Sequence, residues 1–340
     1  MPSGRGFRNV RESDAVRAAS AHPPYCEGVQ GVQGSYVAGI AAVTITSVLW
    51  GTTGTAATFA PDAGPLAIGA AALGIGGLLQ AAVAIRPLAR AARDLRARRG
   101  LVALGAVAVA IYPLAFYSSM HLAGVAIGSV ISLASAPLAS GVLERVVDRR
   151  PLSRPWMLAA GLGIAGAVLL CAAKAGDPSD APSTLAGVAL GLVAGATYAT
   201  YSWVVRRLMG EGIGRAAAMG SVFGAGGVLL LPVLLATGAP LVATPEALAV
   251  AAYMALVPMF LGYVLFGYGL ARISASTATT VTLIEPAVAA VLAVIVVGER
   301  LDVLGWIGLG VIAAALAVLV VAPAAAQRAG ARATAVAAEP

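Results

Sequence analysis

A single acidic residue, Glu285, lies in the middle of a long apolar stretch. Because a charge in hydrocarbon costs at least about 2.5–3.5 kcal/mol, such an acid is a candidate functional group. Thr279 and Thr282 precede it at spacings that place all three side chains on one helix face. Pro286 lacks an amide hydrogen, so it should leave a carbonyl free one turn earlier. The pattern predicts a site for a proton, a sodium ion or a substrate amine. The alternative is that Glu285 is protonated and only bonds a neighbouring helix.

A second row of small polar residues has the same spacing. Ser129, Ser132 and Ser135 precede Pro137 in another apolar stretch. Their hydroxyl groups are able to line a cavity, or to bond carbonyls of their own helix. We expect a partial cavity lining in which Ser132 and Ser135 supply hydrogen bonds to a substrate.

Aromatic residues make up only 6% of the chain, so their positions carry weight. Trp50 and Tyr198 occupy related places in two apolar stretches, and Tyr117 lies near the end of a third. We expect these three rings to wall the cavity, as an aromatic cage that suits flat or cationic molecules. The alternative is anchoring at the membrane interface or plain packing, which we expect for Trp156 and Trp306. Five further rings remain candidates: Tyr112, Tyr201, Trp203, Tyr263 and Tyr268.

The composition identifies the solvent around these residues. The 340 residues are 59% apolar and 11% charged, and the mean hydropathy is +0.90. A soluble domain has about 25% charged residues, so this chain is too apolar to be one, or to be disordered. The two cysteines, Cys26 and Cys171, have no ligand cluster around them, so we expect no metal and no other cofactor. The composition predicts an all-α membrane protein with many spans.

Ten apolar runs are long enough to cross a bilayer, which takes about 20 residues. They lie at about 36–57, 65–86, 101–121, 124–144, 156–174, 184–206, 216–237, 247–269, 274–297 and 303–322. Several connections are very short, which requires neighbouring helices to be antiparallel. The polar segment 1–35 is predicted to be a disordered cytosolic tail, and 323–340 a second cytosolic tail.

The net charge of +7 comes from arginine clusters between the apolar runs, not from a nucleic-acid-binding surface. If the N-terminus is cytosolic, every one of the 22 basic residues except Lys174 and Arg300 falls on the cytosolic side. Positive charge is retained on that side of the membrane. The distribution therefore favours a multi-pass inner-membrane protein with ten spans and both termini in the cytosol.

The two halves of the chain resemble each other at an offset of 149 residues. Pro137 then aligns with Pro286, and Gly161 with Gly310. The predicted organisation is a first repeat at 36–174, a linker at 175–183 and a second repeat at 184–322. With five spans in each repeat, the second copy is inverted in the membrane, a plan common among secondary transporters.

Four motifs then carry a resemblance. Trp50-Gly51-Thr52-Thr53 ends the first run, Ala134-Ser135-Ala136-Pro137 lies in the fourth, and Leu283-Ile284-Glu285-Pro286 and Gly298-Glu299-Arg300-Leu301 lie in the ninth. In this order the chain resembles the drug/metabolite transporter superfamily, and within it the EamA-type ten-span transporters. The first half departs by having Arg149-Arg150 where the second has Gly298-Glu299. The resemblance implies export of small metabolites, amino acids or drugs, through a cavity formed by spans one, three, four, six, eight and nine.

Enzyme chemistry has no support in the sequence. The two histidines lie in the N-terminal tail and at the end of a run, and no H-E-x-x-H or G-x-S-x-G motif is present. We therefore expect a secondary transporter that works by alternating access, as a monomer or homodimer. Its partners are a small-molecule substrate, the lipid bilayer, and a proton or sodium ion if transport is coupled; nucleic acid is not among them. A channel or an uptake carrier of the same architecture is the alternative, and a structural scaffold is a further one.

Overall fold

The computed structural model describes residues 24–57, 59–123, 125–172, 181–292, 294–295 and 303–337, and all regular structure within them is helical. The elements of the first half are α2 (Pro24–Gly51), α3 (Thr53–Ala57), α4 (Pro65–Val83), α5 (Ile85–Arg90), α6 (Ala92–Ala97), α7 (Arg99–Ala123), α8 (Val125–Val146) and α9 (Arg154–Ala172). Those of the second half are α10 (Ala181–Gly210), α11 (Arg215–Thr237), η1 (Ala239–Val242), α12 (Pro245–Met254), η2 (Ala255–Leu261), α13 (Gly262–Leu270), α14 (Ala275–Val281), α15 (Ile284–Leu292) and α16 (Val303–Ala337).

Six helical segments are long and apolar enough to cross a membrane. They are Gly34–Ala57, Pro65–Val83, Arg99–Ala123, Leu185–Gly210, Arg215–Thr237 and Pro245–Leu270. The other four predicted runs coincide with α8, α9, α14 with α15, and α16. The described apolar stretches of α9 and α16 are shorter, at Arg154–Leu169 and Val303–Leu319, and two residues separate α14 from α15.

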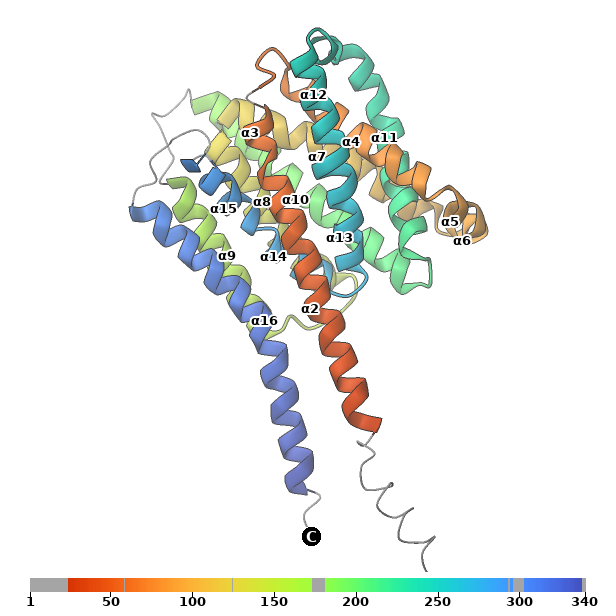
Figure 1. The fold of residues 1–340 in the computed structure, drawn as a ribbon, viewed down its shortest axis with the longest axis vertical. Coiled ribbons are helices and arrows are strands. Elements are labelled where there is room, and N and C mark those ends of the chain that lie inside the picture. The colour runs from red at the N-terminus through yellow and green to blue at the C-terminus, as the bar shows by residue number, and fades with distance from the viewer. Residues whose placement is uncertain are drawn as a thin grey trace, which may run out of the picture.

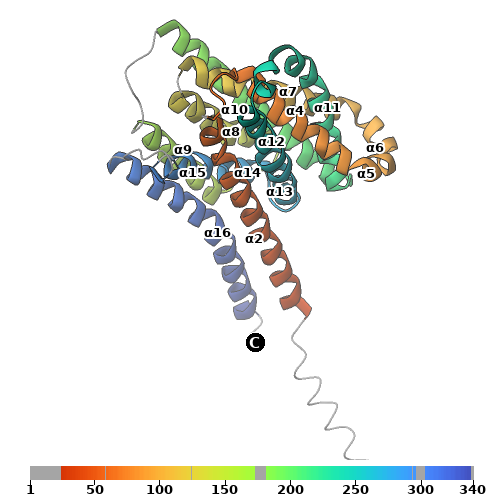
Figure 2. The same ribbon diagram turned by 45° about the horizontal axis from the view of Figure 1, so that its top comes forward.

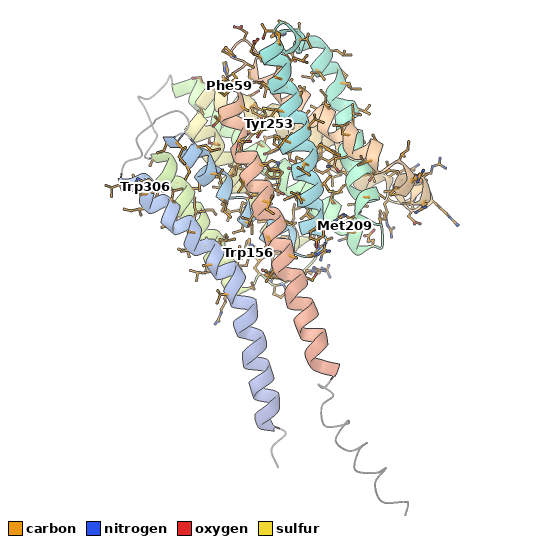
Figure 3. All side chains as sticks on the ribbon, viewed as in Figure 1. Phe59, Trp156, Met209, Tyr253 and Trp306 are labelled. Carbon is orange, nitrogen blue, oxygen red and sulfur yellow. The ribbon has the colours of Figure 1, made fainter. Side chains whose placement is uncertain are left out.

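The outside of the bundle is apolar. Leu235, Leu185 and Ile85 are more than two thirds exposed, and many other large aliphatic side chains share this outer surface. Figure 3 shows Trp306 on the outer side of α16, and this ring is exposed as expected for an interface anchor. Trp156 differs, because its ring is buried against Gly141 of α8. An apolar exterior of this extent is typical of a protein whose solvent is lipid.

Two pairs of helices join the halves of the chain. In Figures 1 and 2, α4 lies beside α11 and α9 lies beside α16. The sequence Gly-X-Gly-Gly occurs at residues 74–77 of α4 and again at 224–227 of α11. A methyl group added to Gly77 would meet the backbone of Phe223, and one added to Gly227 would meet the backbone of Gly74. The absence of side chains therefore lets these two backbones pack directly on each other.

The first helix of each half packs against the other half. The helix α10 contacts α7 and α8, whereas α2 contacts α13 and α15. The glycine row of α10 makes this possible, because Gly187 lies against Ala123 of α7, and Gly195 against the Ser132 backbone of α8. Small residues at these positions let the helix backbones approach closely.

The two ends of the described chain project from the same end of the bundle (Figure 1). The helix α2 begins at Pro24 and α16 ends at Ala337, so both helices extend into ranges predicted as tails. Residues 1–23 and 338–340, the linker residues 173–180 and the Gly298–Leu301 motif lie outside the described residues.

Two breaks in the helices matter for the site. Thr282 and Leu283 separate α14 from α15. In the second break, η2 is a wide π-helical turn around Pro258. Such turns free backbone carbonyls for other donors, and here side chains supply them: Trp50 Nε1 donates to Pro258 O at 3.0 Å and Gln80 Nε2 to Phe260 O at 2.8 Å.

Candidate functional site

A cavity lies at the end of the bundle opposite the two chain termini. It is bounded by the C-terminal ends of α2 and α7, the N-terminal part of α4, and α3, η2, α13 and α15, and it leaves about 360 Å³ free of protein atoms, counting its open mouth. Its lining is aromatic and aliphatic with one charged group: Trp50, Thr53, Gly69, Ala72, Leu73, Tyr112, Pro113, Phe116, Tyr117, Met259, Tyr263 and Glu285.

Glu285 is the acid of this cavity. It lies in the first turn of α15 and is buried. Its Oε2 atom is enclosed and has no hydrogen-bond partner in the described part of the chain. A buried polar atom without a partner costs free energy, so the carboxyl group is available for a ligand that enters the cavity.

The carbonyl that Pro286 was expected to leave free is not free. The acceptor one turn before Pro286 is Thr282 O, and the amide of Glu285 donates to it at 2.9 Å. The break between α14 and α15 tightens the chain by one residue, so a three-residue bond replaces the missing four-residue bond. The expectation of a free carbonyl beside the acid was therefore wrong, and the acid stands without it.

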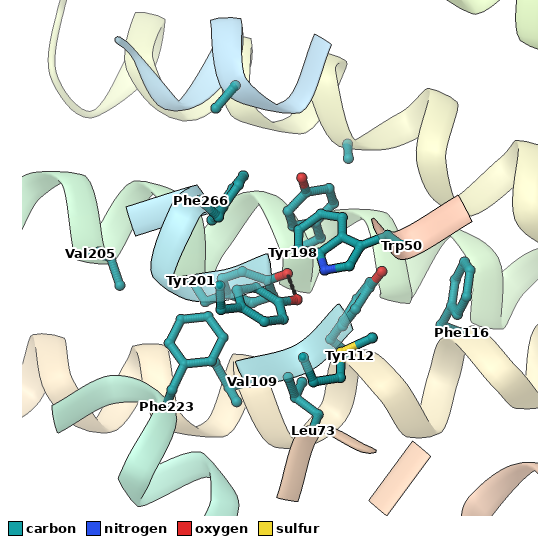
Figure 4. Close-up of a cluster of buried hydrophobic side chains, with 14 of the residues drawn as sticks. Trp50, Leu73, Val109, Tyr112, Phe116, Tyr198, Tyr201, Val205, Phe223 and Phe266 are labelled. Carbon is teal, nitrogen blue, oxygen red and sulfur yellow. Dashed lines mark hydrogen bonds between the residues drawn. The ribbon is translucent and has the colours of Figure 1, made fainter. Parts of the chain in front are cut away.

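Nine aromatic rings form one connected cluster behind and around the cavity, with centroids 4.4–6.1 Å apart. Figure 4 shows most of them, gathered from helices that are far apart in the sequence. The cluster consists of Trp50, Tyr112, Phe116, Tyr117, Tyr198, Tyr201, Phe223, Tyr263 and Phe266. This cluster contains about half of the aromatic residues of the chain. The aromatic residues therefore pack mainly in the interior and not at the membrane interface.

Several polar atoms of the cluster already have partners. The hydroxyl groups of Tyr201 and Tyr263 are hydrogen-bonded to each other at 2.7 Å. The indole N–H of Trp50 is bonded to Pro258 O, and Thr53 Oγ1 donates to Trp50 O at 2.7 Å. Trp50 therefore offers the cavity ring surface and no free N–H, whereas the Tyr201–Tyr263 pair keeps one hydroxyl hydrogen that is not used in their mutual bond.

Three of the residues predicted for the site line this cavity: Trp50, Tyr117 and Glu285. Tyr198 and Thr282 lie beneath the lining, where the Tyr198 hydroxyl donates to Thr282 Oγ1 at 2.9 Å. Both residues are almost completely buried. They connect α10 to the break after α14.

Ser132 and Ser135 lie away from the cavity lining. Ser132 Oγ donates to Gly128 O at 2.7 Å, and Ser135 Oγ donates to Ser132 O at 3.2 Å. Both hydroxyl groups thus bond their own helix, the alternative that their spacing left open. Their role in substrate binding remains a prediction.

Some lining residues were not singled out in the sequence. Phe116 and Met259 are ordinary apolar residues there, and α4 carries no chemical signal beyond its glycines. The helices α8 and α10, which were expected to contribute, supply no residue to this lining, whereas α4 does. Small residues at 69 and 72 let the cavity reach α4, and only packing shows this.

A buried acid at the opposite end of the bundle was also missed. Glu144, near the end of α8, accepts hydrogen bonds from Ser276 N at 3.0 Å and Ser276 Oγ at 2.7 Å. One turn further along α14, Thr279 Oγ1 donates to Ser140 Oγ at 3.2 Å. We name these four residues the α8–α14 seam. In the sequence Glu144 lies at the predicted end of a span, where an acid is unremarkable.

Charged groups beside the seam link α8 to α10. Asp148 accepts hydrogen bonds from Trp203 Nε1 at 2.9 Å and Arg207 Nη1 at 2.7 Å. Arg207 also contacts Glu211, which pairs with Arg98 at 2.6 Å. The bundle is therefore tied by polar contacts at this end and opens into a cavity at the other.

Comparison with known proteins places this chain among transporters. The sequence model of the EamA-like transporter family matches residues 37–172 and 185–321, one copy in each half. An uncharacterised transporter, YwfM, of Bacillus subtilis is 35% identical over 286 residues, which cover 83% of this chain and 93% of the relative. A probable terminal-alkyne amino-acid exporter of Streptantibioticus cattleyicolor is 28% identical over 280 residues, 78% of this chain and 90% of its own. One solved crystal structure, 18% identical, shares the fold with a TM-score of 0.68 over 84% of this chain and 96% of that one.

Proposed function

The chain belongs to the EamA-like transporter family, and from that premise we propose that it exports a small metabolite, amino acid or drug across the inner membrane by alternating access. The unpartnered carboxyl group of Glu285 at an aromatic cavity is the observation that carries the proposal. A carrier needs a site that opens to one side at a time, and the residues that line this cavity lie toward one end of the bundle.

The proposed architecture is ten spans in two inverted five-helix repeats. The family match falls once in each half, and the helices that join the halves, α4 with α11 and α9 with α16, occupy equivalent places in the two repeats. The Gly-X-Gly-Gly sequence in both α4 and α11 supports the same relation. Inverted repeats of this kind carry substrate where the halves meet.

Glu285 is the proposed binding group for the substrate or for a coupling proton or sodium ion. Trp50 and Tyr117 form walls of the proposed site, and Tyr198 with Thr282 holds its floor through their hydrogen bond. Ser132 and Ser135 are proposed to reach substrate only in a state in which α8 moves, since they bond their own helix here.

The α8–α14 seam is the proposed closed gate. On the topology that the arginines favour, Glu144 and Ser276 lie at the cytosolic end and the cavity faces outward. Separation of α14 from α8 would expose Thr279, then Thr282, and so reach Glu285 from the cytosol. This supports alternating access because one set of bonds closes one end only.

The substrate range follows the relatives. One of them is named as a probable amino-acid exporter, which favours export over uptake for this chain as well. Uptake, and conduction through a channel, are the remaining candidates of the same architecture, and the experiment below separates them.

The test compares cells that overproduce the protein, cells that lack it, and cells with Glu285→Gln at equal membrane abundance. We expect a small metabolite to accumulate outside the overproducing cells and not outside the variant. In proteoliposomes loaded with that metabolite, counterflow should saturate and vary with pH for the unaltered protein. Counterflow by Glu285→Gln should be slower and independent of pH, because glutamine exchanges no proton.

Glu246→Gln is the control, because this residue is an exposed glutamate in the first turn of α12, outside the cavity lining. It should behave as the unaltered protein does. Faster depletion of the metabolite from the medium would identify an uptake carrier, and an ohmic current a channel. Undiminished, pH-dependent counterflow in Glu285→Gln would remove the carboxyl group from the mechanism.

A further inference from the structure

We propose that the cavity selects organic ammonium ions with a compact apolar body, binds the ammonium group at Glu285, and discriminates against the same molecule carrying a free carboxylate. This inference rests on the proposed function, since it specifies the substrate class of that site. It assigns the carboxyl group to the substrate, in place of a coupling ion.

The polar groups that line the cavity are rich in acceptors. Glu285 Oε2 is enclosed and unpartnered, and an ionised carboxylate accepts hydrogen bonds without donating any. Thr53 donates its hydroxyl hydrogen to Trp50 O and accepts a hydrogen bond from Tyr117, so it has no donor for a ligand and at most one free lone pair. An ammonium group carries three donors and no acceptor, and is therefore the complement of these atoms.

Hydrogen-bond donors for a substrate carboxylate are scarce. The N–H of Trp50 has a partner, and the hydroxyl groups of Tyr201 and Tyr263 share one hydrogen bond, which leaves one hydrogen of the pair free. The N-terminus of α15, which would otherwise attract an anion, gives little here. Its Glu285 amide is bonded to Thr282 O and Pro286 has no N–H. Among the described lining residues, the remaining side-chain donors are the hydroxyl group of Tyr112 and the hydrogen left free in the Tyr201–Tyr263 pair, because Tyr117 is hydrogen-bonded to Thr53.

Charge reinforces the selection. Among the described residues that line the cavity none is a lysine, arginine or histidine, and Glu285 is the one acidic residue. A substrate carboxylate would therefore lose its water without gaining a cation. An ammonium group gains the opposite charge in a site of low dielectric, where the interaction is strongest.

The rest of the lining suits a small apolar body. Ring faces of Trp50 and Tyr263 lie 4.8 Å apart by centroid, and Tyr112 stacks on Phe116 at 5.6 Å. Ring faces attract cations and apolar groups alike. The close spacing of these rings favours a compact body.

The test measures binding by isothermal titration calorimetry on the purified full-length protein in nanodiscs. The probes share one phenyl group: phenethylamine, phenylalanine methyl ester, phenylalanine, 3-phenylpropanoate and 2-phenylethanol. We expect the two amines without a carboxylate to bind about tenfold or more tightly than phenylalanine. We expect no saturable binding of 3-phenylpropanoate.

Variants assign the effect to one carboxyl group. Glu285→Gln should lose the preference for amines and keep the affinity for 2-phenylethanol, which reports an intact cavity. Glu285→Asp should keep part of the preference, and Glu246→Gln all of it. The inference is overturned if phenylalanine binds as tightly as phenethylamine, if phenethylamine does not bind, or if Glu285→Gln keeps the preference.

Counterflow in proteoliposomes with labelled phenethylamine separates this inference from the proposed function. Selective binding without counterflow would leave the ammonium site standing and remove the carrier. Counterflow of phenylalanine in preference to phenethylamine would support the carrier and overturn the ammonium site.

Discussion

Glu285 stands out in the sequence because no other acid lies so far from the ends of the apolar runs. Its surroundings do not stand out in the same way. Spacing places Ser132 and Ser135 on a helix face, but it does not decide whether a hydroxyl group faces a cavity or a carbonyl of its own helix. In the structure both hydroxyl groups bond carbonyl groups of their own helix, because these carbonyl groups are already held within reach and no further group has to be ordered. Phe116 was missed for a related reason, since an apolar residue in an apolar run carries no signal.

Arg149 is a position at which the two repeats differ, and its backbone conformation bears on that difference. It has a positive φ of 55°, the only such value for a residue other than glycine among those described. It lies in the loop three residues after the end of α8, in the left-handed conformation that glycine adopts most readily. At the offset of 149 residues the second repeat has Gly298 at this position.

Replacing Arg149 with glycine should therefore stabilise the protein. We expect Arg149→Gly to raise the free energy of unfolding by about 0.5–1 kcal/mol, because glycine adopts this conformation without the clash of a Cβ atom. Thermal melting in detergent measures it. Arg150→Gly is the matched control and should give no gain. An equal gain in both variants would assign the effect to lost charge and not to backbone strain.

At the scale of elements, hydropathy predicts where helices are but not which helices meet. The ten apolar runs all coincide with helices, since burial in lipid demands that backbone groups bond within the segment. The contact of α2 with α13 and α15 was not predictable in this way. It depends on particular pairs, such as Thr46 Oγ1 donating to Gly262 O at 3.0 Å. Pro286 in the sequence was a signal for the break between α14 and α15. The wide turn of η2 had no comparable signal, because its free carbonyl groups accept hydrogen bonds from side chains of α2 and α4 that only the folded chain brings near.

The crossing of α4 and α11 tolerates no added side chain. We expect Gly77→Ala to lower the free energy of unfolding by about 1–3 kcal/mol or more, because the new methyl group would meet the Phe223 carbonyl. Melting of the purified variant in detergent measures the loss. Gly161→Ala is the control, since nothing lies within 4 Å of the added atom. Similar melting temperatures for the two variants would contradict the direct backbone contact.

The seam between α8 and α14 makes a prediction about motion. Glutamine at 144 offers one acceptor to a serine that donates two bonds, so Glu144→Gln should weaken the seam and populate the opened state. We expect a cysteine placed at Thr279, in a background with Cys26 and Cys171 replaced by serine, to be alkylated from the cytosolic side about tenfold faster.

The same reporter with Glu246→Gln should be alkylated at the original rate. No acceleration in Glu144→Gln would mean that the seam is a static packing contact, and the gate would have to lie elsewhere.

For the whole molecule, the arrangement of arginines predicted a topology that the described structure accommodates. The ends of α2 and α16 project from the same end of the bundle, which requires an even number of crossings. The cavity and the seam were not visible at this scale, because each is built from segments of both halves.

We predict that reporters fused to the N-terminus and to the C-terminus both lie in the cytosol. Green fluorescent protein should fluoresce at either end, and alkaline phosphatase should be inactive at either end. A phosphatase fused after Ala63, between α3 and α4, should be active and is the positive control. Activity at one terminus only would exclude ten spans and reverse the sidedness of the cavity.

The exchange of first helices between the halves has a consequence for how the chain is made. The ribosome releases α2 first, yet the groups that hold it come late: Thr46 bonds a carbonyl 216 residues further on, and Trp50 one that is 208 residues further on. During most of translation α2 therefore has none of these partners and must wait in the lipid beside the translocon. Since Trp50 joins the wall of the cavity only when η2 and α13 arrive, a nascent chain that stops before residue 258 contains a first half without a binding chamber.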